Sequence, residues 1–164
     1  MELDVPIYIH PHLPPEPVRQ AYYSDLQPGA GRVLHVLRMV LAGTLDRHPR
    51  LRLVSGHMGE MPPVMLARID EVSALDIEHL QRPIGRAILD QVWLTTSGIF
   101  SEPPFLAALL TFGIDRIMFS VDYPYAPNAK GRDFLDGISL APADMAKLTH
   151  NNADAQLKLK VGAG

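Results

Sequence analysis

Four short runs of apolar and β-branched residues recur along the chain, and each has the length of a buried strand. Such runs, bounded by glycine, proline or polar residues, are typical of strands in a protein core. The first must end near His10, because the proline-rich stretch that follows cannot donate to a ladder of hydrogen bonds. The pattern therefore predicts strands at residues 5–10, 51–56, 92–98 and 115–122.

Between these runs the apolar residues return every three or four positions, which is the spacing of a helix that packs by one face. Two prolines at the start of one segment suit a first helical turn, and Gly113 ends another where helices favour a left-handed cap. A long loop follows the first strand, and the last five residues are expected to be disordered. Helices are predicted within residues 31–49, 62–72 and 103–113, and two short ones within 141–159.

The alternation of strand and helix predicts one α/β domain, over residues 1–164, in which parallel strands are joined by right-handed crossovers. A closed barrel of eight βα units typically needs about 250 residues. This chain has 164 residues, enough for four such units. We therefore expect half of a barrel or a small open sheet.

Composition excludes several classes of protein. The net charge of −3 argues against nucleic acid or an anionic membrane as a partner. No apolar run approaches the roughly 18 residues that span a bilayer, and the first ten residues lack the pattern of a signal peptide. The chain has no cysteine, which excludes disulfides, iron–sulfur clusters and thiolate zinc sites. A cytoplasmic location fits these features.

Each predicted strand ends in a polar residue: His10, His57, Ser97 and Asp122. The carboxyl ends of parallel strands converge on one rim, and imidazole and carboxylate together suit zinc, manganese or iron. Each residue alone has another interpretation. His10 could be a hydrogen-bonded structural histidine, Asp122 could open a turn, and His57 with Glu60 could cap the following helix.

The segments VPIYIHP, HPRLRLVSGHMGEMPPVMLARID, VWLTTSGIF and DRIMFSVDYPY, in this order, resemble the amidohydrolase-superfamily decarboxylases. The similarity is greatest to the γ-resorcylate and dihydroxybenzoate decarboxylases, and it runs from about Leu3 to Leu159. The fold of that family is a (β/α)₈ TIM-type barrel. The resemblance implies that this chain is its C-terminal half, with the last four βα units.

The resemblance also implies a metal site and an acid–base pair. His10 and Asp122 match ligands of a divalent metal ion, zinc or manganese. His57 matches a histidine beside the substrate, and Glu60 its hydrogen-bonding partner. Asp122 corresponds to the residue usually assigned as the proton donor to the ring carbon.

Two further positions match residues that contact substrate in the family. Arg68 corresponds to an arginine that reaches towards the substrate carboxylate across a subunit interface. Tyr125 lies where an aromatic residue lines the pocket. The implied substrate is a small aromatic carboxylate, and the implied assembly is a homo-oligomer.

One departure from the family leaves several interpretations open. Relatives carry two more metal ligands on a first strand that has no counterpart here, and tight sites use three or four ligands. The chain could rebuild a site by oligomerising, it could be a scaffold without catalysis, or it could be a non-catalytic partner of a full-length relative. Within the enzyme interpretation, the alternative to decarboxylation is hydrolysis of a lactone or amide by metal-activated water, with His57 as base.

Overall fold

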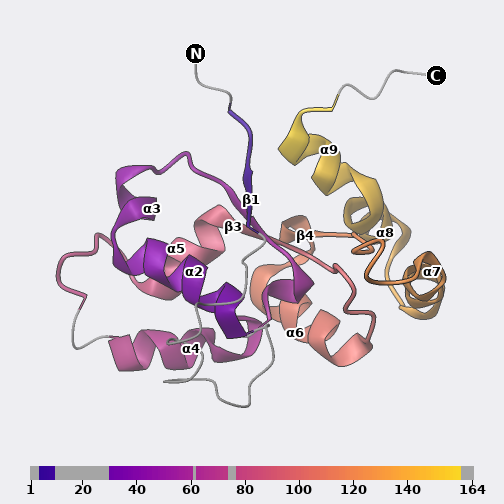
Figure 1. The fold of residues 1–164 in the computed structure, drawn as a ribbon, viewed down its shortest axis with the longest axis horizontal. Coiled ribbons are helices and arrows are strands. Elements are labelled where there is room, and N and C mark those ends of the chain that lie inside the picture. The colour runs from indigo at the N-terminus through magenta and orange to yellow at the C-terminus, as the bar shows by residue number, and fades with distance from the viewer. Residues whose placement is uncertain (1–3, 10–29, 61, 74–76, 160–164) are drawn as a thin grey trace.

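A four-stranded parallel sheet forms the centre of the protein (Figure 1). The computed structural model describes residues 4–9, 30–60, 62–73 and 77–159. Within them the strands pair in chain order, with Leu53 of the second strand opposite Ile7 and Val92, and Ile117 opposite Leu94. The predicted parallel sheet is therefore confirmed, with strands β1 (Ile7–Ile9), β2 (Leu53–Ser55), β3 (Val92–Thr95) and β4 (Ile117–Met118).

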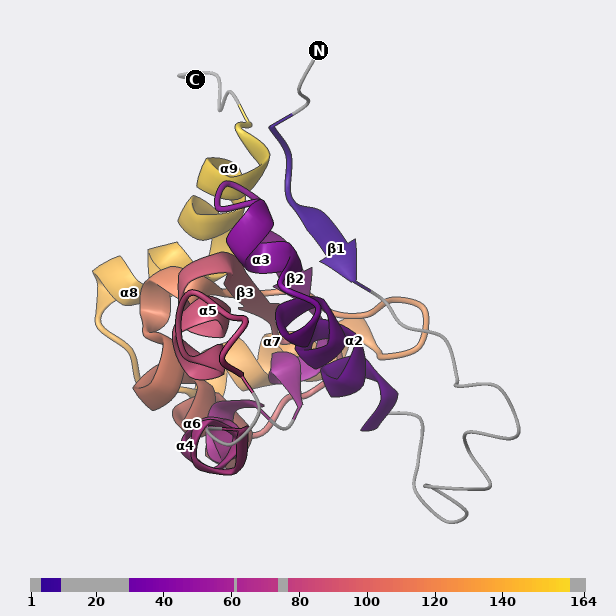
Figure 2. The same ribbon diagram turned by 90° about the vertical axis from the view of Figure 1, so that its left-hand side faces the viewer.

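Helices surround this sheet in two groups (Figures 1 and 2). The first group covers one face and comprises α2 (Ala30–Leu41), α3 (Thr44–Arg47), α4 (Pro62–Ser73), α5 (Ile84–Gln91) and α6 (Glu102–Phe112). The second group gathers beside β4 and comprises α7 (Asn128–Gly137), α8 (Pro142–Ala146) and α9 (Asn152–Leu157). Three single turns join these elements: η1 (His57–Gly59), η2 (Ile114–Arg116) and the π-turn η3 (Lys147–Asn151). None of the helices in the described residues has the length and apolarity needed to cross a bilayer.

Several details differ from the sequence-based expectation. Gly43, with φ of 68°, divides the predicted helix at 31–49 into α2 and α3. Helices α5 and α7 were not predicted: α5 is short and runs directly into β3, while α7 contains Gly131 and is poor in apolar residues. Gly131 packs against Phe119, where a Cβ would lie 3.0 Å from the ring. This glycine therefore allows close packing and does not mark a turn.

Two terminal predictions have different outcomes. Gly113 has a φ of 77°, as a left-handed cap requires, but its ψ of 159° belongs to an extended conformation open to glycine. Residues 160–164 and the long loop after β1 lie outside the described residues.

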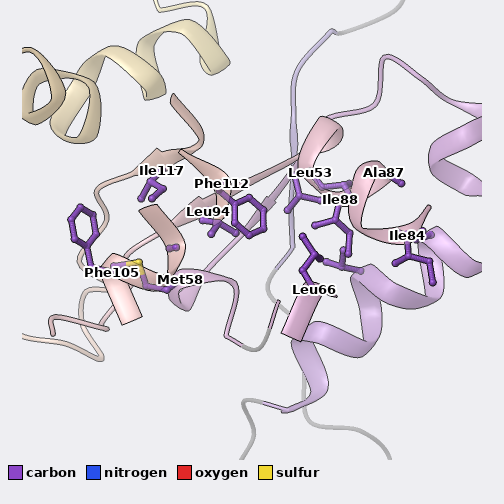
Figure 3. Packing of buried hydrophobic residues seen from close by; sticks show 14 of the residues in the cluster. Leu53, Met58, Leu66, Ile84, Ala87, Ile88, Leu94, Phe105, Phe112 and Ile117 are labelled. Carbon is purple, nitrogen blue, oxygen red and sulfur yellow. The ribbon is translucent and has the colours of Figure 1, made fainter. Parts of the chain in front are cut away.

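Strands β2, β3 and β4 are buried on both faces of the sheet, and successive side chains of each strand point to opposite faces. On the helix-covered face, Leu53, Leu94 and Ile117 pack with Ile88 and Phe105 in the main core (Figure 3). On the opposite face a smaller cluster forms, in which Val54, Trp93 and Met118 pack against Ala153 of α9. Burial of one such aliphatic side chain contributes about 1.5–3 kcal/mol.

Hydrogen bonds from η3 and α9 cover the outer edge of β4. On β4 the amide of Phe119 donates to the carbonyl of Leu148 at 2.7 Å, and Asn152 Nδ2 donates to the carbonyl of Ile117 at 2.8 Å. These groups point away from β3, which is bonded through the carbonyl of Met118. Segment η3–α9 therefore occupies the outer edge of β4, where a further strand could otherwise pair.

The segment before β1 and the end of α9 are joined by polar contacts. Arg52 Nη2 donates to the carbonyl oxygen of Asp4 at 2.7 Å, and Arg52 Nη1 donates to Gln156 Oε1 at 3.3 Å. Lys158 forms an ion pair with Asp4, and its hydrogen bond lowers the pKa of that carboxyl group. Parts of the chain 154 positions apart thus lie side by side.

Replacing Asn152 tests the closure of the β4 edge. Its Nδ2 group also donates to the carbonyl of Ile114 at 2.7 Å, and the side chain is buried. We expect Asn152→Ala to lower the free energy of unfolding by about 1–3 kcal/mol, since two carbonyl groups lose their donor. Urea unfolding measures this, with the exposed neighbour Asn151→Ala as control. Equal loss in both variants would contradict the assignment.

Candidate functional site

Residues with a strained backbone conformation follow the carboxyl ends of three neighbouring strands of the sheet. After β2, His57 and Glu60 have φ of 53° and 59°; after β3, Ser97 has φ of 29°; after β4, Asp122 has φ of 71°. A non-glycine residue with positive φ costs about 1–3 kcal/mol, and such residues concentrate at functional sites. Three of the four residues are catalytic candidates from the sequence, which makes this rim the candidate site.

Turn η1 is anchored so that His57 and Glu60 lie at its two ends. Between them, Met58 is inserted into the core, and Gly59 packs against Leu94 so closely that a Cβ would lie 2.7 Å from a methyl group. His57 and Glu60 are half-buried, and His57 Nε2 and Glu60 Oε2 are shielded from solvent. The turn therefore fixes an imidazole and a carboxylate three positions apart at the rim.

Three hydroxyl groups, of Tyr8, Thr95 and Ser97, meet just beneath the rim; we name them the hydroxyl cluster. The Tyr8 hydroxyl lies 2.8 Å from Thr95 Oγ1 and 3.0 Å from Ser97 Oγ, and the last two oxygens are 2.6 Å apart. Tyr8 belongs to β1 and Thr95 to β3, so their side chains meet over β2. Gly56 borders the cluster, since a Cβ there would lie at ordinary contact distance, 3.5 Å from the Tyr8 hydroxyl and 3.6 Å from Ser97 Oγ.

The side chain of Asp122 lies over the backbone of Gly98. A Cβ on Gly98, which has φ of 78°, would be 3.5 Å from both Asp122 Cβ and Asp122 Oδ2. The carbonyl of Asp122 accepts hydrogen bonds from the amides of Tyr125, at 2.8 Å, and Ala126, at 3.0 Å. The turn that holds the aspartate contains a cis peptide bond between Tyr123 and Pro124.

The structure brings part of the predicted site together. Gly56, which precedes His57, lies beside Ser97. Gly98, which follows Ser97, lies beside Asp122. These contacts place the ends of β2, β3 and β4 in one continuous rim. His10 lies outside the described residues, so its predicted role as a ligand stays a prediction.

The two predicted substrate contacts are on the surface. The side chain of Arg68 is 66% exposed on α4 and pairs with Glu71, Nη1 to Oε2, at 3.3 Å. Tyr125 is 86% exposed in the turn that follows Asp122. Both roles stay predictions.

The donor chemistry of the rim fits manganese or zinc only in part. Carboxylate and imidazole are ligands that both ions accept. Within the described part of the chain, however, no three histidine, aspartate, glutamate or cysteine side chains lie close enough to hold an ion. Asp122 is the expected ligand that this part contains.

The four parallel strands, with polar residues after β2, β3 and β4, form an α/β fold of the TIM-barrel type, in which enzymes carry the active site at the carboxyl ends of the strands. More narrowly, the chain belongs to the amidohydrolase family, because the family model described as "Amidohydrolase" matches residues 1–159.

Curated relatives of this chain include decarboxylases of aromatic acids. It is 35% identical to the decarboxylase orsB of Emericella nidulans, over 96% of this chain and 54% of the relative. It is also 35% identical to the γ-resorcylate decarboxylase of a Rhizobium species, over 96% and 52%. The chain thus spans about half the length of the curated relatives it matches.

Solved structures that resemble this chain also include decarboxylases, and the chain again covers about half of each. A 2,6-dihydroxybenzoate decarboxylase in complex with 2,6-dihydroxybenzoate superposes with a TM-score of 0.85 at 33% identity, covering 52% of that chain. A dihydroxybenzoic acid decarboxylase from Polaromonas, with bound manganese and the inhibitor 2-nitroresorcinol, superposes with a TM-score of 0.88 at 33% identity, covering 51%. The expected relation of this fold to half of a TIM-type barrel is confirmed.

Removing the Tyr8 hydroxyl tests the hydroxyl cluster. We expect Tyr8→Phe to lower the free energy of unfolding by about 0.5–1.5 kcal/mol, because Thr95 and Ser97 lose a shared partner. Thermal unfolding measures the change. Tyr123→Phe, at an exposed tyrosine, is the matched control and should leave stability unchanged. An unaffected Tyr8→Phe protein would mean that the cluster adds nothing to stability.

Proposed function

We propose that this protein contributes to the metal-dependent, non-oxidative decarboxylation of a small aromatic acid that resembles dihydroxybenzoate. The observation that carries the proposal is the rim on which His57, Ser97 and Asp122 end three adjacent strands with positive φ. Its support is the 33–35% identity to dihydroxybenzoate and γ-resorcylate decarboxylases. Localised strain at the predicted acid–base residues is typical of a site whose geometry serves chemistry.

The reaction requires one proton and no redox cofactor. A proton adds to the ring carbon that bears the carboxylate. The bond between that carbon and the carboxyl carbon then breaks, its electron pair returns to the ring, and carbon dioxide leaves. The substrate carboxylate and one proton thus give an arene and carbon dioxide, so the protein must deliver a proton to carbon.

Asp122 is the proposed proton donor, and His57 with Glu60 is the pair that handles a proton beside it. Half-burial of Asp122 over Gly98 shields the carboxyl group from water on one side and holds it at the rim. Glu60, at the other end of the same rigid turn, can orient the His57 imidazole. General acid–base groups of this kind contribute about 10²–10⁴-fold to rate.

Substrate binding involves groups beyond these three residues. His10 and Asp122 are the residues of this chain that would hold a zinc or manganese ion, and the ion would supply positive charge for an anionic substrate. Arg68 is the proposed carboxylate contact and Tyr125 the proposed aromatic wall. Because both are exposed in the single chain, their roles depend on assembly into the homo-oligomer that we propose.

Two alternatives use the same rim. Hydrolysis of a lactone or amide would employ His57 as the base that activates water. A non-catalytic role, as a scaffold or as partner of a full-length relative, would require no turnover at all. Product analysis separates the two chemistries, and metal content measured with solution mass separates both from the non-catalytic role.

The direct test is an assay of the purified protein with 2,6-dihydroxybenzoate and Mn²⁺. We expect resorcinol and carbon dioxide from the unmodified protein, and loss of about 10²-fold or more in rate for Asp122→Asn, which cannot supply a carboxyl proton. Removal of metal with a chelator should abolish the reaction. Liquid chromatography of the products measures all three.

Asp133→Asn is the matched control, because Asp133 is an exposed carboxylate on α7. It should retain the full rate. Equal rates for Asp122→Asn and the unmodified protein would exclude Asp122 as the donor. Absence of resorcinol under every metal condition would exclude decarboxylation by this chain alone.

A further inference from the structure

We infer that Thr96 is a positioning residue for Asp122. This inference extends the proposed function, since it concerns the residue that delivers the proton, and it rests on hydrogen bonds between the ends of β3 and β4. Thr96 follows the last residue of β3 and is 0% exposed. Thr96 was not among the predicted site residues.

The Thr96 hydroxyl makes two hydrogen bonds to one residue of the neighbouring strand segment. Thr96 Oγ1 donates to the carbonyl of Ser120 at 2.6 Å and accepts from the amide of Ser120 at 2.9 Å. The hydroxyl thus supplies both the acceptor and the donor that backbone C=O and N–H groups supply in a regular ladder. The side chain therefore continues the β3–β4 pairing past Met118, where the regular ladder ends.

This bridge lies two residues before Asp122. The amide and the carbonyl of Ser120 are both hydrogen-bonded to Thr96. Only Val121 separates Ser120 from Asp122 and its strained backbone. Two residues beyond Thr96, Gly98 lies against the carboxylate of Asp122. Thr96 and Gly98 thus fix the approach of Asp122 to the rim from the same segment of chain.

The positive φ of Asp122 makes such a bridge necessary. A residue with φ of 71° would relax towards an ordinary conformation if its neighbours allowed it, so strain persists only where the surroundings impose it. The bond from Thr96 fixes the chain before Asp122, and the amides of Tyr125 and Ala126 fix its carbonyl after it. Without the hydroxyl of Thr96 the first of these restraints is lost.

The test uses Thr96→Val, which keeps the shape of the side chain and removes the hydroxyl, and Thr96→Ser, which restores it. The matched control is Thr111→Val. Thr111 Oγ1 donates to the carbonyl of Pro63 at 2.7 Å, between α6 and α4. It is a comparable threonine bond outside the rim, so it separates general stability from positioning.

The first measurement is amide hydrogen exchange. We expect the Ser120 amide to exchange about tenfold faster in Thr96→Val, relative to the core amides of the same protein, and to be protected again in Thr96→Ser. Thr111→Val should leave the Ser120 amide unchanged relative to the core. Equal effects of Thr96→Val and Thr111→Val at Ser120 would overturn the inference.

The second measurement is Mn²⁺ affinity by titration. Loss of a group that orients a ligand typically weakens metal binding about 10- to 100-fold. We expect that increase in Kd for Thr96→Val, recovery in Thr96→Ser and no change in Thr111→Val. An unchanged Kd in Thr96→Val would overturn the inference.

The two measurements distinguish this inference from the proposed function. If the unmodified protein binds no Mn²⁺, the metal-dependent function fails, and hydrogen exchange at Ser120 alone decides whether Thr96 positions the segment. If Mn²⁺ binds and resorcinol forms, but Thr96→Val leaves the Kd and the exchange rate unchanged, the function stands and the inference fails.

Discussion

Burial of β3 on every side is the constraint on which the rest of the structure depends. All four of its residues are buried, it pairs with β2 on one edge and β4 on the other, and its side chains enter both clusters of the core. The position of β3 is thus fixed in all directions. The three residues that follow it, from Thr96 to Gly98, continue this fixed strand into the rim and contact the segments around Gly56, Ser120 and Asp122.

The rim concentrates strain on a rigid base. Each left-handed non-glycine residue is unfavourable by itself, and the surrounding contacts must outweigh that cost. Here they can be identified: Met58 in the core for the turn at His57, the hydroxyl cluster for Ser97, and the bonds to Ser120 and from Tyr125 for Asp122. Residues held in this way have little freedom to rearrange, which is what proton transfer at a fixed distance requires.

The fold could be predicted from the sequence to the extent that hydrophobic periodicity determines it. The four strands and their parallel order follow from short apolar runs that alternate with helical spacing. Helices α5 and α7 could not be found in this way, since α5 is short and continuous with β3, and Gly131 in α7 is explained only by its close tertiary contacts, among them Phe119. Contacts between distant residues carry no periodic signal.

The candidate site was predictable only in outline. Polar residues at strand ends indicated His57 and Asp122, because parallel strands bring their carboxyl ends together. Tyr8 was not identified, and no role was predicted for Thr96 at its strand end, as their partners lie 87 and 24 positions away in the chain. The two-residue alternation of a strand was the available signal, because it puts Thr95 and Ser97 on one face and Thr96 on the other.

The unequal edges of the sheet make its extension directional. At β4 the carbonyl of Ile117 is already bonded to Asn152 and the amide of Phe119 to Leu148. An additional strand at this edge would have to displace these partners. Within the described residues β1 has a neighbour on one side only. A strand that pairs with this sheet without displacing a described partner would therefore pair with β1, whose side chain Tyr8 contacts the rim through the hydroxyl cluster. Such pairing would act on the same strand that supplies Tyr8 to the hydroxyl cluster.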